Sequence, residues 1–451
     1  MTDGPTSQNS RATKRSFVLV CLVTLGVAAR FFVLTDRYAV NVLFSDQWGV
    51  YNPLFYGYGI WQTFTMQHGP PRLGVGIFLT EAVALATGWN TRAEAFAAGF
   101  IFCLVAIAAL YLKWRLFKSL TVWDSLIPLI VLSLSQVSSN AVVAFPAYSA
   151  VPVLLLMLYA VGLTCRNVKL RYGALSLLNF LLAFSCWGIF VGLLTPLLLA
   201  FLLFRHAAAR EGAAKRWAGV ALAASLLSLA LFFIDYKFQP AVGCFHFPHY
   251  PPGDYFLFVA HIFSYSVGVG CRYQKVSEGI GSVLVLVFLF VLAAELRELA
   301  RGKEYEPKRI VIVAFISFSL VFALNAAFGR VCLGVCAAVT DRYQALLTPA
   351  WLGLYFAVTG LGKRFQRVSA CFLIFTLCFL VPQLKESSYE RDMGHYTEAK
   401  KKWVACYLEK EDAAVCDVDA GLTIYTPNRN AELKDKLDYL KRRRLNFFAG
   451  Q

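Results

Sequence analysis

The residues of this sequence best suited to chemistry are an acid in an aromatic stretch and a group of basic residues. Asp46 stands in the segment LFSDQW. A carboxyl group beside an apolar boundary loses solvation, so its pKa is expected to rise and it becomes suited to taking a proton from a hydroxyl near neutral pH. An exposed Asp that caps a helix fits the position of Asp46 equally well.

Basic residues in two other places could bind a phosphate. Arg330 follows Phe328-Gly329, and the segment DRY (Asp341, Arg342 and Tyr343) comes shortly after it. A guanidinium group binds a phosphate in a bidentate manner, although an ion pair between Asp341 and an arginine is an equally good interpretation.

The segment QHGPPR supplies His68 and Arg72, which could contact the same phosphate or a sugar hydroxyl. The alternatives are a surface histidine and an interfacial arginine anchor. Trp48, Tyr51 and Trp61 belong to the same aromatic stretch, where they could form platforms for a sugar ring or an isoprenoid, or an interfacial belt.

Metal-ligating patterns are weak. His246, His249 and Asp254 lie in CFHFPHYPPGDY, where two histidines three residues apart could hold a metal but are more simply surface residues of a Pro-rich loop. We find no zinc spacing, P-loop, dinucleotide motif or internal repeat. The sequence therefore predicts no certain cofactor, with a divalent metal as an open possibility.

These residues must be positioned by membrane helices. Of the 451 residues, 58% are hydrophobic and only 16% are charged, and the mean hydropathy is +0.58. A soluble domain averages about 25% charged residues. Apolar runs near the ~20 residues that cross a bilayer recur along the chain, so we expect an all-α polytopic membrane protein.

The distribution of Lys and Arg predicts the topology, because short basic loops stay in the cytoplasm. With the N-terminus inside, the predicted inner loops (1–15, 113–124, 166–172, 205–217, 295–309 and 362–368) hold 21 of these residues and the outer short segments hold eight. This count requires 73–87 and 254–270 to lie along or dip into the outer surface, and 173–204 to form a helical pair that turns near Trp187-Gly188. About eleven crossings result.

Three regions follow from this topology: a cytoplasmic N-terminus (1–15), a transmembrane domain (16–384) whose first outer loop spans 35–72, and an extracytoplasmic tail (385–451). Cys406 and Cys416 are ten residues apart in the polar tail, so a disulfide is predicted there. Two free thiols in a cytoplasmic tail are the alternative. The other ten cysteines are interpreted as packed thiols in or beside apolar runs.

The net charge of +16 is mostly the bias of the inner loops and does not indicate nucleic acid. The run Lys441–Arg444 in the tail is more simply a solvated helix face or a contact with anionic lipid.

The segments FSDQW, HGPPRLG and TGWN, followed much later by GR and DRY before an apolar span, resemble the GT-C superfamily of membrane glycosyltransferases in layout over roughly residues 17–360. The resemblance implies a bundle of about eleven membrane helices, a long first outer loop with surface-lying helices, a small external tail domain and a polyprenyl-phosphate sugar donor. It implies Asp46 as the base that activates the acceptor and Arg330 and Arg342 as ligands of the donor phosphate, with Asp341, His68 and Arg72 in the same cavity.

Many members of that superfamily have two adjacent acids in this loop, whereas here Gln47 follows Asp46. The departure favours a metal-independent, inverting displacement, with Asp36 as a reserve acid. The expected protein is therefore an enzyme of the bacterial inner membrane that passes a sugar to a glycan or lipid-linked acceptor on the outer face. The rivals are a polysaccharide or lipid transporter, and an O-antigen polymerase or ligase.

Overall fold

The computed structural model describes residues 6–144, 146–240, 242–302, 305–361, 370–371, 373–374, 376, 388–425 and 430–450. Over these residues the chain is helical, and the only strand-like feature is an isolated bridge between Gln67 and Arg72. The predicted basic loop 362–368 and most of the last predicted span lie outside the described residues.

The helices of the bundle and its loops follow in chain order. They are α1 (Thr6–Tyr38), α2 (Gln47–Val50), α3 (Asn52–Tyr56), α4 (Ile60–Phe64), α5 (Gly74–Thr87), α6 (Thr91–Phe117), α7 (Leu126–Val131), α8 (Leu134–Val142), α9 (Ala150–Leu163), α10 (Val168–Ala183), α11 (Ile189–Ala208), α12 (Gly212–Phe233), α13 (Gly253–Tyr265), α14 (Gln274–Arg301), α15 (Pro307–Arg330) and α16 (Gln344–Thr359). Short 3-10 turns include η2 (Cys186–Gly188) and η6 (Asp341–Tyr343). The tail forms α18 (Ser388–Lys410), α19 (Ala413–Ala420), α20 (Asn430–Arg443) and η10 (Asn446–Phe448).

Seven helical stretches among the described residues are long and apolar enough to cross a membrane. Many of their large apolar side chains face outward, for example Phe290 and Phe204, each 75% exposed. Such side chains cost free energy in water but not in lipid. The prediction of an all-α multi-pass membrane protein is confirmed at this level.

The short helices bear on the predicted span count. A helix needs about 20 residues to cross a bilayer, and α5 and α13 have 14 and 13. Both fit the expectation that 73–87 and 254–270 do not cross. The helical pair predicted for 173–204 is present as α10 and α11, which turn at Cys186–Gly188. However, α9, α10 and α16 are also shorter than 18 residues, so the number eleven stays a prediction.

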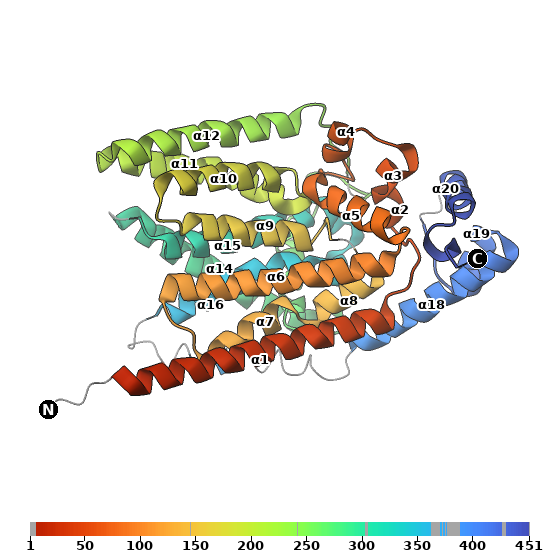
Figure 1. Ribbon diagram of the computed structural model, residues 1–451, viewed down its shortest axis with the longest axis horizontal. Helices are drawn as coiled ribbons and strands as arrows, with labels where there is room; N and C mark the ends of the chain where they lie inside the picture. Colours follow the sequence, from red (N-terminus) through yellow and green to blue (C-terminus); the bar gives the residue numbers. More distant parts are fainter. Residues whose placement is uncertain are drawn as a thin grey trace.

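The loops collect at two opposite ends of the bundle. Figure 1 shows the long helices side by side, with α2 to α5 and α18 to α20 gathered at the end away from the N-terminus. We call this the loop end. At the other end, the turns after α6, α9 and α14 meet around Lys118, Arg166 and Tyr305. We call that the basic end, because its loops carry most of the predicted inner Lys and Arg.

The tail packs against the first loop rather than forming a separate unit. Trp48 and Tyr51 of the first loop share one buried cluster with Trp403 and Leu437 of the tail. Lys436 donates from Nζ to the carbonyl oxygen of Trp48 at 2.8 Å, which fixes α20 over α2.

Candidate functional site

Segments that are far apart in sequence meet at the loop end around Asp46. They are the start of α2, the turn that contains His68, the connection between α8 and α9 with Tyr148, the end of α15 with Arg330, and η6 with Arg342. The carboxylate of Asp46 interacts with His68, Arg342 and Arg330, so these predicted site residues are brought together.

The backbone around Asp46 is held by the tail. Ser45 has a φ of 55°, in the left-handed region that non-glycine residues rarely adopt, and its N–H donates to the carbonyl oxygen of Ile424 at 2.9 Å. Asp46 stands at the N-cap position of α2 but makes no side-chain capping bond. Its side chain is 48% exposed. The interpretation of Asp46 as a capping residue is therefore wrong.

His68 lies directly beside Asp46. Its Nε2 atom is 3.9 Å from Oδ1 of Asp46, which is within ion-pair range but longer than a direct hydrogen bond. The imidazole packs over α2 at Gly49, where a Cβ atom would lie 2.5 Å from Cε1 of His68. It also meets the ring of Tyr148 edge to face, with 6.0 Å between centroids. Only a glycine at position 49 leaves room for this arrangement.

The acidity of Asp46 differs from the expectation. Interaction with His68 lowers the pKa of Asp46, burial opposes this, and the charges of Arg342 and Arg330 lower the pKa further. The net shift is downward, so the predicted rise is wrong. The cause is that desolvation is outweighed by three nearby groups that favour the carboxylate.

The two arginines flank one aromatic ring. Arg330 donates from Nη1 to the hydroxyl of Tyr343, and the guanidinium carbons of Arg330 and Arg342 lie 5.5 and 5.7 Å from the centroid of its ring. Tyr343 is buried, whereas Arg342 is exposed. The ring of Tyr343 thus lies next to both cations, whose charges also act on Asp46.

Asp341 does not pair with these arginines. Its two oxygens accept hydrogen bonds from Ser138 at 2.5 Å and from Tyr265 at 2.6 Å. Burial raises the pKa of Asp341. This acid therefore anchors η6 to α8 and α13, and the predicted ion pair with an arginine does not form among the described residues.

Arg72 has a different environment from the one expected. Its Nε donates to the carbonyl oxygen of Phe232 at 2.9 Å, Nη2 to that of Ile234 at 2.5 Å, and Nη1 to that of Thr65. The residue is 4% exposed. Because all three nitrogens bind backbone oxygens, the expectation that Arg72 grips a phosphate does not fit. It joins the first loop to the end of α12.

The aromatic residues of the first loop fall into a buried group and an exposed group. Trp48 and Tyr51 are 0% and 1% exposed and belong to the packing between loop and tail, so the prediction that they line a substrate cavity is wrong. Tyr51 donates to Glu94 at 2.5 Å. Trp61 is 54% exposed on α4, and its ring stacks on Phe64 with 5.8 Å between centroids.

A hollow of about 140 Å³ adjoins Arg330. Its wall is largely aromatic, with Trp187, Phe245 and Phe328 on different segments and Pro70 on the first loop. Aromatic faces beside a cation provide stacking surface for a sugar ring or an isoprenoid unit next to a phosphate site. This hollow was not predicted, because its wall comes from four separate segments: the first loop, η2, the connection after α12 and the end of α15.

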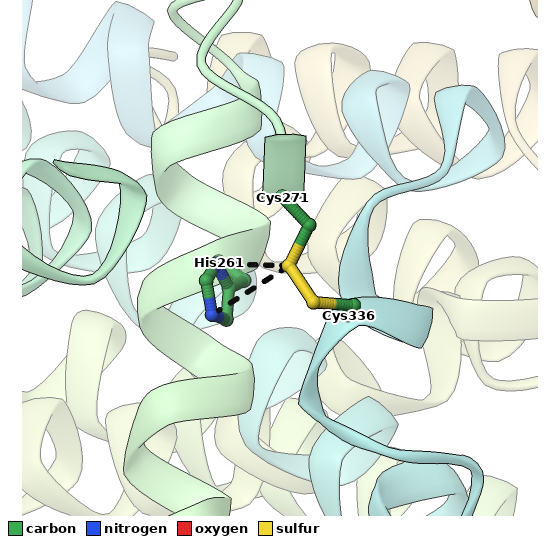
Figure 2. A group of neighbouring side chains, drawn as sticks. All are labelled: His261, Cys271 and Cys336. Carbon is green, nitrogen blue, oxygen red and sulfur yellow. Dashed lines mark hydrogen bonds between the residues drawn. A yellow bond between two sulfur atoms is a disulfide. The ribbon is translucent and has the colours of Figure 1, made fainter. Parts of the chain in front are cut away.

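The one group of three possible metal ligands among the described residues is His261, Cys271 and Cys336. Figure 2 shows that the two cysteines form a disulfide beside His261. Sγ of Cys271 lies 3.9 Å from both ring nitrogens of His261. A sulfur equidistant from both nitrogens does not lie along the lone pair of either. Nδ1 of His261 also lies 2.7 Å from the hydroxyl of Ser277. As a disulfide, this group does not suit a metal.

The histidines of the Pro-rich loop do not converge either. Nδ1 of His249 lies 3.2 Å from Nε2 of His246, while its other nitrogen lies 3.3 Å from Asp254. The two nitrogens of His249 point to different partners, so the three residues form a polar chain rather than a site around one point.

The environment of Gln47 bears on the absence of a second acid next to Asp46. It is 2% exposed, and its amide nitrogen donates to Ala144 at 3.0 Å and to Glu94 at 3.3 Å. Position 47 thus faces inward while Asp46 reaches the site, so an acid at position 47 would not share a ligand with Asp46 in this conformation.

Three disulfides lie at the loop end. The predicted Cys406–Cys416 pair is present, with 5.6 Å between Cα atoms. Cys244–Cys332 and Cys271–Cys336 are also paired, so the interpretation of these four cysteines as packed thiols is wrong. The partners are 88 and 65 residues apart, and spacing alone does not give such connectivity.

Sequence reasoning missed Tyr148 and the contact of Tyr343 with both arginines. Tyr148 is half-buried beside His68, and burial raises its pKa. The signal available was a tyrosine in the short connection 143–149 (VAFPAYS), which follows the polar run SQVSSN.

No family model matches the chain, and no curated protein matches it.

Proposed function

We propose that this protein is a membrane glycosyltransferase that passes a sugar from a polyprenyl-phosphate donor to a glycan or lipid-linked acceptor. The observation that carries the proposal is the gathering of Asp46, Arg330 and Arg342 at one end of a membrane helix bundle. One carboxylate and two cations are the groups that displacement of a phosphate by a hydroxyl requires.

The reaction uses each group at a separate atom. The acceptor hydroxyl oxygen attacks the anomeric carbon, and its proton passes to Asp46. The bond between the anomeric carbon and the phosphate oxygen breaks, and the polyprenyl phosphate leaves with the electron pair. Arg330 and Arg342 stabilise the negative charge on that phosphate. Attack opposite the leaving group inverts the anomeric configuration.

Donor binding would also change the pKa of Asp46, the proposed base. In the free site the charges of Arg342 and Arg330 lower the pKa of Asp46, which makes the carboxylate a weak base. A bound phosphate neutralises part of that charge, so the pKa of Asp46 rises when the donor is in place. Asp46 thus becomes a better base when its substrate has arrived.

The surroundings suit a donor confined to the bilayer. The hollow beside Arg330 offers Trp187 and Phe328 as stacking surface for the sugar or the first isoprenoid units. We assign the loop end to the extracytoplasmic face of the bacterial inner membrane, because the basic loops occupy the opposite end. A divalent metal is not required by this scheme.

A polymerase or ligase that acts on a lipid-linked donor would also use the arginine pair. The position of Asp46 favours the glycosyltransferase, since the carboxylate is exposed toward both arginines and is not used as a cap.

The arginines provide the test. We expect Arg330→Gln and Arg342→Gln to raise the apparent KM for a sugar-labelled polyprenyl-phosphate hexose by about tenfold each, the value of one good charge-assisted contact. Arg272→Gln is the matched control, because Arg272 is exposed and its guanidinium carbon lies 5.8 Å from the ring centroid of the adjacent Tyr273. Transfer rates in membranes that do not differ between the three variants would refute the proposal.

A further inference from the structure

The basic end of the bundle contains a second polar cavity, of about 500 Å³. Its wall is formed by the end of α6, the connection from α9 to α10, and the start of α15. Five cations line it, contributed by all three segments: Arg115, Lys118, Arg166, Arg171 and Lys308.

The cavity has little negative charge to offset these cations. Its one lining acid, Glu306, lies 2.5 Å from Nε of Arg309 and is paired there. Across the described residues, none of the five lining cations forms an ion pair. Like charges gathered in a concave wall repel one another and attract an anion.

Part of the wall is held in place before any ligand arrives. Nε of Arg171 donates to the carbonyl oxygen of Cys165 at 2.8 Å, and its guanidinium carbon lies 4.0 Å from the ring centroid of Tyr305. Tyr305 in turn donates to the carbonyl oxygen of Leu163 at 2.7 Å. A guanidinium positioned in this way loses less side-chain entropy when it binds an anion.

A larger apolar groove adjoins this cavity. The groove, of about 1150 Å³, lies between α1 and α6 and is lined by residues that include Leu25, Leu110 and Trp114. Lys118 lines both the groove and the cavity. An amphiphile with acyl chains in the groove would therefore bring its headgroup to Lys118 and the other cations.

We propose that the cavity binds the phosphate group of an anionic membrane phospholipid whose acyl chains lie in the groove between α1 and α6. Arginine and lysine match the charge of the phosphate, and the adjoining groove favours a lipid over a soluble phosphate. This lipid site is at the opposite end of the bundle from Asp46, so it does not depend on the proposed glycosyltransferase activity.

The test is native mass spectrometry of the full-length protein taken from vesicles of phosphatidylglycerol and phosphatidylcholine in equal amounts. The variant is Arg166→Gln with Lys308→Gln. The control is Lys215→Gln with Arg216→Gln, which removes the same charge from two exposed residues near the basic end that do not line the cavity. The single variant Arg166→Gln changes only an exposed side chain and guards against misfolding of the double variant.

We expect the wild-type protein and the control to retain phosphatidylglycerol in preference to phosphatidylcholine. In the double variant this preference should fall at least tenfold, and in Arg166→Gln it should fall by a smaller factor. Equal loss in the control would overturn the proposal, because it would show a general surface charge effect. Binding of inorganic pyrophosphate without any retained phosphatidylglycerol in the wild-type protein would overturn the lipid as the ligand and indicate a soluble phosphate instead.

Discussion

Asp46 acts as a group whose charge depends on its neighbours. His68 is the largest influence that lowers its pKa, and burial is the influence that opposes this. An imidazole at 3.9 Å and two arginines beyond it therefore keep the carboxylate ionised in the free protein. The chemistry of the site should be sensitive to each of these neighbours in turn.

The first prediction concerns His68→Gln. Removing the imidazole removes the largest influence that lowers the pKa of Asp46, so that pKa rises. Because the base acts only when it is ionised, the acid limb of kcat/KM against pH should move to higher pH. His395→Gln, a change at an exposed histidine of α18, should leave the limb in place. An unchanged acid limb in His68→Gln would show that His68 does not control the ionisation of Asp46.

The sequence predicted which charged residues form the site, but not which way the loop side chains point. The types of Asp46, Arg330 and Arg342 and their place in predicted outer loops were enough to propose one site. Which way a loop side chain points depends on partners elsewhere in the chain. Trp48 faces Tyr425 of the tail, and Arg72 faces the carbonyls that end α12. Neither contact can be predicted from the local sequence.

At the scale of elements, the first loop and the tail form one unit. Ser45 bonds to Ile424, and Asn446 of η10 donates to Gly88 through its backbone at 2.9 Å and to Trp89 through its side chain at 2.6 Å. The tail thus holds both ends of the segment that carries Asp46. The sequence predicted a small tail but not this role, because the apolar residues of the tail are spread over three helices.

Lys400 provides a prediction for this interface. The side chain is 3% exposed, donates to the carbonyl oxygen of Val142 and lies 4.6 Å from the ring centroid of Phe44. Burial lowers the pKa of Lys400 from 10.5 to about 7. Between these two values the unfolded chain binds more protons than the folded one, so stability should rise with pH across that window.

The variant Lys400→Met should remove this rise. We expect its melting temperature in detergent to exceed that of the wild type by about 2–4 °C at pH 6, with the difference narrowing as pH increases toward 10. Lys401→Met is the control, because that side chain is 59% exposed. A difference that stays constant with pH would mean that Lys400 keeps its ordinary pKa in the folded protein.

At the scale of the whole molecule, the bundle has two chemically different ends. The three disulfides among the described residues lie at the loop end, whereas Cys165 beside the basic cavity is free. Disulfides persist on the oxidising side of a membrane, and basic loops stay on the cytoplasmic side. Both patterns support the proposal that the loop end lies outside.

This assignment predicts the labelling of introduced cysteines. Val418→Cys changes a residue that is 81% exposed on α19, and a maleimide that cannot cross membranes should label it in intact spheroplasts. Lys215→Cys, near the basic end, should be labelled only after permeabilisation. The wild-type protein gives the background from its own free cysteines. The reverse pattern would invert the topology and move the site to the cytoplasm.

The most direct measurement of the central claim is sugar transfer by Asp46→Asn in membranes supplied with a labelled polyprenyl-phosphate hexose. Loss of a general base predicts a fall of about 100-fold or more at equal protein level. Asp36→Asn is the matched control, because its carboxylate is 67% exposed and pairs with Arg92 at 2.7 Å; this variant should keep the wild-type rate. Wild-type transfer by Asp46→Asn would contradict the role of Asp46 as the base.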